Sequence, residues 1–244
     1  MRPDRQAAAL AARRVEVLYA TPAQLRLMVE AADFPALRRV VVGGSKLDPG
    51  LRAALGPAEV REFYGAAEAS FITLSGPGTP EASVGAPYPG VELEVRGGEV
   101  RVRSPYLFRR YAGEDPGGAL WCDGWLSVGE RGRLEGGFLY LSGRAGRMVT
   151  VADQNVFPEE IELFLMGLPG VERAAVLPRP DPLRGVHLVA VLRGDPAREG
   201  EILAACRGRL GALKAPKAVI WRADWPVLPS GKTDFRALAR EIGA

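Results

Sequence analysis

Side chains that could do chemistry occur in four short stretches of this 244-residue sequence, and the first combines a glycine with a carboxylate. Residues 64–68 (YGAAE) follow directly on residues 60–63, which are predicted to form a β-strand. Open α/β sheets bind ligands at the carboxyl ends of their strands. A glycine there lets a ligand approach the backbone, and a carboxylate can hold Mg²⁺. The stretch predicts a ligand site, with a Tyr-Gly turn beside a surface glutamate as the alternative.

Charged side chains also stand in three further glycine-containing stretches. These are residues 124–130 (GWLSVGE), 143–144 (GR) and 228–233 (LPSGKT). The GKT triplet suggests a P-loop, but that motif requires a glycine where this sequence has Pro226. The P-loop interpretation therefore fails. For Lys232 the alternative to a site is a solvated lysine in a turn.

The elements that must position these residues begin with alternating strand and helix patterns. Buried strands are predicted at residues 15–19 (VEVLY) and 38–42 (RRVVV), and a third strand is predicted at residues 60–63. Thr21 predicts a helix N-cap, because Pro22 follows at the first helical position and Gln24 completes a capping box. Asp48 and Pro49 predict the start of a second, short helix. This alternation favours a parallel sheet with crossover helices.

The pattern changes at Ser83, where turn residues are followed by short segments of alternating polarity. The predicted strands are VELEV, EVRVRS, WLSV, GRLEG and FLYLSG. Residues 113–119 predict a Gly-rich loop. Such strands suit a small antiparallel or barrel-like subdomain.

Residues 143–162 (GRAGRMVTVADQNVFPEEIE) predict a joint between two domains. Glycines open the stretch, and a helix is expected to begin at Pro158. Its apolar face is Ile161, Phe164, Leu165 and Leu168, and Gly170 is expected to end it. Three further strands and two helices are predicted at residues 173–177, 186–192, 218–221, 202–210 and 235–242.

The predicted fold class is α/β plus α+β. We expect part of a parallel αβ sheet domain over residues 1–142, with the β subdomain from about residue 83, and a compact α+β domain over residues 143–244.

Composition limits the classes of function. The net charge is only +3, with no basic stripe, so a nucleic-acid role has little support. Cys122 and Cys206 are the two cysteines and His187 is the one histidine, which disfavours disulfide frameworks, zinc sites and His-based triads. A reducing, cytoplasmic location is expected, and no apolar run is long enough for a membrane span.

Five motifs in collinear order resemble the adenylate-forming superfamily, which includes acyl-CoA synthetases, peptide-synthetase adenylation domains and firefly-type luciferases. The motifs are SVGAPYPGVELEV, EVRVRSPYLFRRY, DGWLSVGERGRLEGGFLYLSGR, NVFPEEIE and LPSGKTDFRAL. Together they run over the second half of a family member. The resemblance implies activation of a carboxylic acid by ATP to acyl-AMP and pyrophosphate, usually followed by transfer to a thiol.

The resemblance also implies roles for individual residues. Lys232 matches the catalytic lysine, which places positive charge between the carboxylate and the α-phosphate. Glu68 matches the Mg²⁺ ligand. The nucleotide-binding positions are Gly43, Gly44, Ser45, Tyr64, Gly65, Glu130 and Arg144, with Glu130 and Arg144 on the ribose. Gly146 matches the hinge about which the C-terminal domain swings. The implied cofactors are ATP or AMP and Mg²⁺.

Some positions depart from the family pattern. The glycine-rich phosphate loop does not occur in these residues. Ala67 and Val128 replace threonines, and Glu130 replaces an aspartate. Thr150 replaces a lysine. Asp153 replaces a glycine beside the pantetheine path, where its charge would repel CoA.

The sequence therefore leaves two classes of function open. The first is an AMP-forming acid–thiol ligase that is incomplete, and weak or inactive on its own. The second is a degenerate family member that binds an adenylate, an acyl ligand or a partner chain without turnover. A folded gene fragment without a role is a third interpretation. The acid is a small carboxylic acid whose identity the sequence leaves open.

The apolar strands at residues 15–19 and 38–42 need cover on both faces of their sheet. We therefore expect a homo-oligomer or a partner chain that supplies the missing half.

Overall fold

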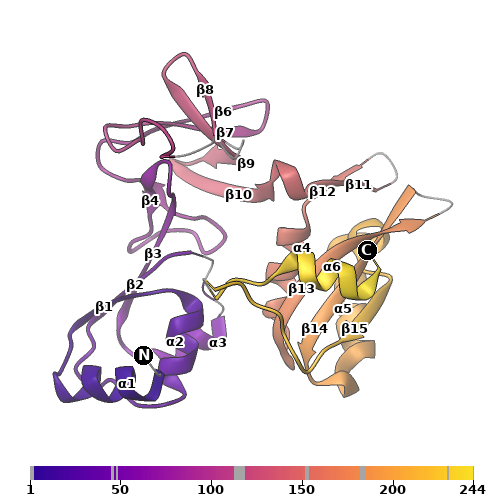
Figure 1. Cartoon of the computed structure of the whole chain (residues 1–244), viewed down its shortest axis with the longest axis horizontal. Helices are drawn as coiled ribbons and strands as arrows, with labels where there is room; N and C mark the ends of the chain where they lie inside the picture. Colours follow the sequence, from indigo (N-terminus) through magenta and orange to yellow (C-terminus); the bar gives the residue numbers. More distant parts are fainter. Residues whose placement is uncertain are drawn as a thin grey trace. The chain divides into compact units, whose positions relative to one another are not determined.

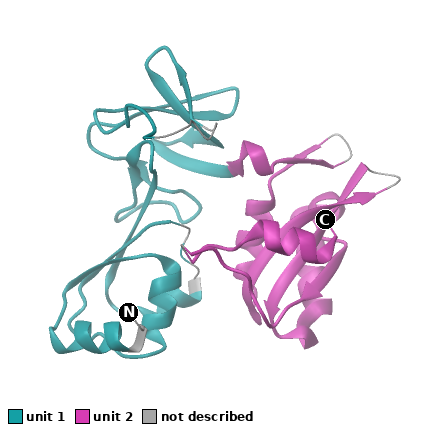
Figure 2. Ribbon diagram, viewed as in Figure 1, with its two compact units in different colours: residues 1–142 teal, residues 143–244 magenta. Residues whose placement is uncertain are grey.

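The computed structural model describes residues 3–44, 47, 49–112, 119–151, 154–181, 185–229 and 231–243. The chain divides into two compact units, Met1–Ser142 and Gly143–Ala244 (Figure 2). Each unit has its own sheets and its own buried apolar clusters, and Figure 1 labels the elements.

The first unit begins with the parallel strands that the sequence pattern predicts. β1 (Val17–Ala20) pairs in parallel with β2 (Arg39–Val42), and β2 pairs in parallel with β3 (Glu59–Ala66). The helices of this region are α1 (Pro3–Ala12), α2 (Pro22–Val29) and α3 (Pro49–Ala54). Since α2 joins β1 to β2 and α3 lies between β2 and β3, the crossover arrangement is confirmed.

Local chemistry fixes the start of α2. The Gln24 backbone N–H donates to Thr21 Oγ1 at 3.3 Å, and the Thr21 N–H donates to Gln24 Oε1 at 2.9 Å. This is the expected capping box, which satisfies two N–H groups that a helix end otherwise leaves open. Leu25 and Met28 then face the core and pack with Val40 and Val42 of β2.

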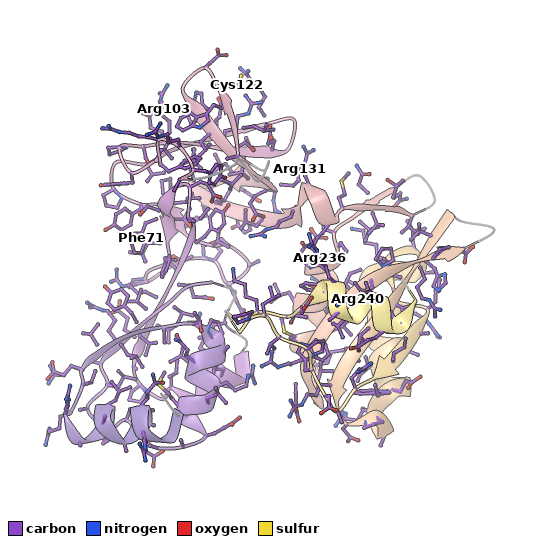
Figure 3. The ribbon with its side chains drawn as sticks, in the orientation of Figure 1. Phe71, Arg103, Cys122, Arg131, Arg236 and Arg240 are labelled. Carbon is purple, nitrogen blue, oxygen red and sulfur yellow. The ribbon has the colours of Figure 1, made fainter. Side chains whose placement is uncertain are left out.

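Two strands that the sequence did not reveal extend this sheet. β4 (Ser70–Leu74) pairs antiparallel with β3, and β5 (Ala86–Pro87) pairs antiparallel with β4. Aromatic rings pack together at this end of the sheet. The ring centroid of Phe71, which is labelled in Figure 3, lies 4.6 Å from that of Phe63 and 5.2 Å from that of Tyr88.

A second, antiparallel sheet follows, with strand order β10-β9-β7-β6 and β8 paired to β9. Its strands are β6 (Glu92–Arg96), β7 (Glu99–Arg103), β8 (Leu120–Cys122), β9 (Trp125–Glu135) and β10 (Phe138–Arg144). The segments WLSV and GRLEG form one 11-residue strand, β9, rather than two. Over the described residues the sheet is open and does not close into a barrel.

The second unit is built on a three-stranded sheet. It starts with the short helix η1 (Ala145–Arg147) and a hairpin of β11 (Val149–Val151) and β12 (Gln154–Val156). The sheet strands are β13 (Val171–Asp181), β14 (Gly185–Gly194) and β15 (Ala218–Trp221). β13 runs antiparallel to β14, and β15 runs parallel to β14.

Three longer helices and the short η2 (Pro196–Arg198) complete this unit. The longer ones are α4 (Pro158–Met166), α5 (Glu199–Lys214) and α6 (Phe235–Ile242). Ile161 and Leu165 of α4 are buried, as the periodicity predicts, and they pack with Ile202 and Cys206 of α5.

The prediction that Gly170 ends α4 is wrong. The helix ends at Met166, with Gly167 as its C-cap. Gly170 lies further on in a turn with φ of +84°, and its carbonyl accepts from the Asp195 N–H at 2.8 Å. Its left-handed backbone therefore serves the approach to β13 rather than the helix end.

Candidate functional site

The glycines after β2 stand at the carboxyl end of a parallel strand. A Cβ on Gly43 would lie 2.1 Å from the ring of Phe63. The packing of Phe63 therefore requires a residue without a side chain at this position. Gly44 has a φ of +98°, which favours glycine. Ser45, the third residue of this predicted nucleotide loop, lies outside the described residues.

Leu47 is held to the sheet by a buried carboxylate that sequence reasoning missed. Glu62 of β3 accepts the Leu47 N–H at 2.8 Å and pairs with Arg52 at 2.6 Å. Its own N–H donates to Ser75 Oγ at 2.7 Å. The available signal was a carboxylate directly before Phe63 in a predicted strand, because such a group needs partners when it is buried.

The predicted YGAAE stretch forms the end of β3 and the turn into β4. The β3–β4 register shifts between Tyr64 and Gly65, so this is an irregular, bulged position. A Cβ on Gly65 would lie 2.3 Å from the backbone carbonyl oxygen of Ser70. Gly65 is therefore required by the turn itself. Tyr64 is half-buried and packs on the cluster that contains Ile72, Val102 and Leu126.

Glu68 is half-buried in this turn and is held by a segment far along the chain. Tyr111 Oη donates to Glu68 Oε1 at 2.9 Å, and the Phe108 N–H donates to the Glu68 carbonyl oxygen at 2.8 Å. Within the described residues, no group of three His, Cys, Asp or Glu side chains is arranged to hold a metal ion alone. One carboxylate fits Mg²⁺ in a nucleotide site, where phosphates and water supply the other ligands.

Glu130 is placed by a bulge in β9. Arg101 and Glu99 of β7 face Ser127 and Arg131 of β9, so the bulged strand has extra residues between them. Gly129, with φ of +77°, allows the bulge. Such bulges re-aim side chains, and here Glu130 is buried with 8% of its surface exposed.

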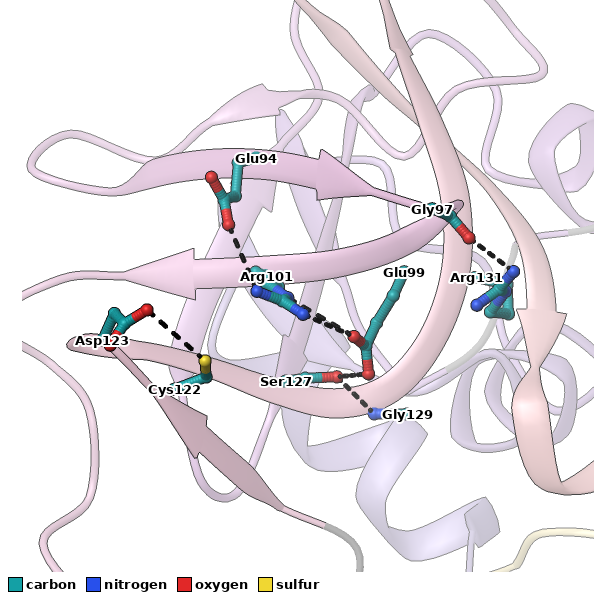
Figure 4. Close-up of polar contacts among 9 residues, drawn as sticks. All are labelled: Glu94, Gly97, Glu99, Arg101, Cys122, Asp123, Ser127, Gly129 and Arg131. Carbon is teal, nitrogen blue, oxygen red and sulfur yellow. Dashed lines mark hydrogen bonds and ion pairs between the residues drawn. The ribbon is translucent and has the colours of Figure 1, made fainter.

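Polar contacts hold the bulge in place (Figure 4). Ser127 Oγ donates to Glu99 Oε1 at 2.8 Å and accepts the Gly129 N–H at 3.2 Å. The hydrogen bond from Ser127 and the nearby Arg101 keep the pKa of Glu99 below its usual value, although burial opposes this. Val128, next to the bulge, packs on the same apolar cluster as Tyr64, so the structure brings the Tyr64 and Glu130 motifs to one core.

The remaining predicted residues lie in the second unit. Arg144 is exposed, and its backbone N–H donates to Glu159 Oε1 at 3.4 Å. Gly146 lies in η1, where a Cβ would meet nothing within 4 Å. Thr150 is exposed on β11 and contacts Asn155 Oδ1 at 3.4 Å. Asp153 lies outside the described residues.

Lys232 is exposed in a tight turn before α6. The Leu228 N–H donates to the Lys232 carbonyl oxygen, and the Gly231 N–H donates to the Leu228 carbonyl oxygen, both at 2.8 Å. Trp225 Nε1 donates to Thr233 Oγ1 at 3.1 Å. The turn is therefore formed by backbone hydrogen bonds and by the contact of Trp225 with Thr233.

Arg147, the last residue of η1, links this short helix to the rest of the second unit, and sequence reasoning missed it. Its guanidinium donates to both carboxylate oxygens of Glu162, at 3.0 and 2.7 Å, and lies 3.9 Å from the ring centroid of Phe235. The Val176 N–H also donates to Glu162 at 2.7 Å. A glutamate between Ile161 and Leu165 on the apolar face was the signal for a buried partner.

Burial and pairing act against each other in this cluster. Burial raises the pKa of Glu162, and the contacts with Arg147 and the Val176 N–H oppose that rise. Burial acts to lower the pKa of Arg147, but Glu162 outweighs it and the pKa is raised. Because Phe235 begins α6, Arg147 connects η1 to the element that directly follows the Lys232 turn.

The cysteines and the histidine take no part in these groups. Cys122 is exposed (Figure 3), while Cys206 is buried in the core of the second unit, where burial raises the pKa of its thiol. His187 lies on β14, as predicted, with Nδ1 3.5 Å from Asp181. In the described part of the chain, no helix has the length and apolar character that a membrane crossing requires.

The fold and the site together define the class: a two-unit α/β protein with a candidate nucleotide site at the carboxyl ends of parallel strands. The family model for AMP-binding enzymes matches residues 1–112, and the model for the AMP-binding enzyme C-terminal domain matches residues 160–232. The chain belongs to the adenylate-forming superfamily, as its motifs predicted.

Individual relatives agree with this assignment. An uncharacterized acyl–CoA ligase, YhfT, of Bacillus subtilis is 33% identical over 239 residues, which cover 89% of this chain and 48% of YhfT. The amide bond synthetase McbA from Marinactinospora thermotolerans has a TM-score of 0.86 at 30% identity, covering 99% of this chain and 55% of McbA. ATP-bound MatB from Rhodopseudomonas palustris has a TM-score of 0.83 at 25% identity, covering 99% and 53%. The chain spans about half the length of the relatives it matches.

Proposed function

We propose that this chain is part of an AMP-forming acid–thiol ligase, which converts a carboxylic acid and ATP to acyl-AMP and pyrophosphate and then forms a thioester. The observation that carries the proposal is the carboxylate of Glu68, which Tyr111 holds by a hydrogen bond at the carboxyl end of β3. The chain that carries it belongs to the adenylate-forming superfamily. Neutralising and positioning the phosphates is the main task in such chemistry, and a fixed metal ligand contributes directly to it.

The residue roles follow from position. Glu68 would hold Mg²⁺, which when bound neutralises phosphate charge. Tyr64 would lie beside the adenine, and Glu130 would accept from the ribose hydroxyls with Arg144 assisting. Their placement supports these roles: Glu68 is fixed by Tyr111, and a bulge aims Glu130.

The glycines have a more limited role than the motif suggests. Gly43 and Gly65 are each required by internal packing, against Phe63 and the Ser70 carbonyl. We propose that they shape the adenine wall without offering room to the ligand. Gly44 retains open space apart from the Thr21 methyl group at 3.6 Å.

The lysine and the hinge serve the first and second half-reactions. Lys232 would place its ammonium between the carboxylate and the α-phosphate, and Gly146 would be the pivot. The group that accepts the acyl moiety in the second half-reaction differs between relatives, because YhfT is named an acyl–CoA ligase and McbA an amide bond synthetase. We propose a thiol acceptor, with CoA disfavoured by the charge of Asp153.

A second candidate is ligand binding without turnover. It is favoured by Ala67, which has no hydroxyl for the α-phosphate, and by the lack of a family-type phosphate loop in these 244 residues. Losing preorganised phosphate donors costs orders of magnitude in rate but leaves adenine and ribose contacts in place.

ATP–pyrophosphate exchange with a panel of aliphatic, aromatic and amino carboxylates separates the two candidates. Acid-dependent exchange supports the ligase. Saturable binding of AMP without any exchange, over the whole panel, supports the binding protein and contradicts the ligase proposal.

We also propose that a second copy of the chain or a partner chain covers part of the first unit. β1 stands at one end of its sheet order in the described structure, and Val17 and Tyr19 on it are 48% and 67% exposed. Exposed apolar edge strands tend to pair with another chain. Light scattering at micromolar concentration should show a mass above that of one 26.1 kDa chain, and a stable monomer would contradict self-association.

A further inference from the structure

The contacts of Glu68 come from one short segment. Tyr111 binds its carboxylate at 2.9 Å, and the backbone N–H of Phe108 binds its carbonyl oxygen at 2.8 Å. The side chain and the backbone of Glu68 are therefore both tied to residues 108–111. Both partners lie in the motif EVRVRSPYLFRRY, and the resemblance implies no role for either of them.

Tyr111 is itself held in position. Its ring lies 4.8 Å from the Phe108 ring, at an interplanar angle of 64°, and Phe108 stacks at 6.3 Å on Trp121. Phe108 also packs on the cluster of Ile72, Val102 and Leu126 beneath the site. A phenol supported in this way is a fixed donor, and edge-to-face ring pairs resist reorientation.

We propose that Tyr111 is a positioning residue for the metal-binding carboxylate of Glu68. The phenol occupies Oε1, and Oε2 would be the oxygen that binds a hard divalent cation. Hydrogen bonds to a ligating carboxylate orient it and are an integral part of a metal site. This inference rests on the proposed function, because that function gives Glu68 its metal.

Tyr111→Phe tests the proposal, since it removes one oxygen atom and keeps the ring. The probe is Mn²⁺ with α,β-methylene-ATP, and free Mn²⁺ is measured by electron paramagnetic resonance. Loss of an outer-shell partner typically weakens metal binding about 10–100-fold. We expect the dissociation constant of Mn²⁺ to rise about tenfold, with the carboxylate KM unchanged wherever exchange is measurable.

Tyr106→Phe is the matched control. Tyr106 is in the same unit, and its Oη donates to the Pro89 carbonyl oxygen at 3.1 Å instead of to Glu68. This variant should bind Mn²⁺ as the parent does. In a Glu68→Gln background, Tyr111→Phe should change Mn²⁺ affinity by less than about twofold, because two residues that act through one contact are not additive.

The proposal is overturned if Tyr111→Phe binds Mn²⁺ like the parent, if Tyr106→Phe is equally impaired, or if the parent binds no Mn²⁺ with this nucleotide. An effect of Tyr111→Phe that persists undiminished in the Glu68→Gln background also overturns it. A parent that binds Mn²⁺ through Tyr111 and Glu68 but catalyses no exchange contradicts the ligase proposal alone, so the two failures are distinguishable.

Discussion

Replacing Lys232 with alanine is expected to reduce acid-dependent ATP–pyrophosphate exchange by about 10²–10³-fold, the usual cost of removing a preorganised group that stabilises transition-state charge. Both the attacking carboxylate and the α-phosphate are anionic, so a cation between them acts mainly in the transition state. The turn should survive the change, because backbone hydrogen bonds between Leu228, Gly231 and Lys232 form it. The rate should therefore fall without a comparable change in AMP binding.

Lys217→Ala controls for the loss of a positive charge on this unit. Lys217 is also exposed, and its Nζ donates to the Ala212 carbonyl oxygen at 2.8 Å. It should keep parental exchange. Equal exchange in the parent and in Lys232→Ala would show that Lys232 is a solvated turn residue, the alternative that its motif leaves open.

The parts of the fold that the sequence predicted are those that local chemistry determines. Thr21 and Gln24 lie within one helical turn of each other, so their capping box could be recognised before any tertiary contact was known. The face of α4 follows from spacing alone. The parallel pairing of β1 with β2, and of β2 with β3, followed from the helices predicted between these strands.

The parts that the sequence missed depend on distant partners. β4 is paired with β3 across a turn, where Phe63 lies opposite Leu74. β5 is paired with β4, and a strand of two residues has no sequence pattern of its own. β9 is a single strand because Gly129 allows a bulge where glycine would otherwise indicate a break. The subdomain stays open for a similar reason: closure depends on edge pairing, which alternation of polarity does not encode.

The candidate site shows the same division. Glu68 and Lys232 could be selected from motifs, because the chemistry requires a carboxylate and a cation. The support of the glutamate is Tyr111, from a distant part of the chain. The lysine turn is held by backbone hydrogen bonds and by the side-chain contact between Trp225 and Thr233, which no motif letter reveals. Gly43 and Gly65 illustrate the converse, since a motif glycine can serve packing and not the ligand.

Arg147→Met is expected to destabilise the second unit by about 3–5 kcal/mol, the usual cost of leaving a buried charge without its partner. Glu162 would keep the Val176 N–H but lose two charged hydrogen bonds, and Phe235 would lose its cation contact. The side chains of Arg147 and Glu162 are 24% and 10% exposed, so solvent screens the pair only in part. Hydrogen exchange of β13 peptides, read by mass spectrometry, measures the effect.

Arg133→Met separates burial from the contacts themselves. Arg133 also pairs with a carboxylate, Glu135 at 3.1 Å, and lies 4.3 Å from the Tyr140 ring, but its side chain is 61% exposed. Exposed pairs contribute at most about 1 kcal/mol, so hydrogen exchange of peptides from β9, which carries Arg133, should remain close to the parent. A similar loss in both variants would show that burial of Glu162 is not the cause.

The destabilisation by Arg147→Met should also depend on pH in a fixed direction. Burial already raises the pKa of Glu162, and removing Arg147 removes the main group that opposes the rise. A carboxyl with a raised folded-state pKa favours folding while it is protonated, and this contribution is lost as pH rises through that pKa. The difference in the free energy of unfolding between Arg147→Met and the parent should therefore be smaller near pH 5 than near pH 8.

Glu162→Gln in the Arg147→Met background is the control for this pH dependence. It should remove the dependence, since the amide carries no charge at either pH. If the difference between Arg147→Met and the parent stays constant with pH, ionisation of Glu162 is not the cause of the destabilisation.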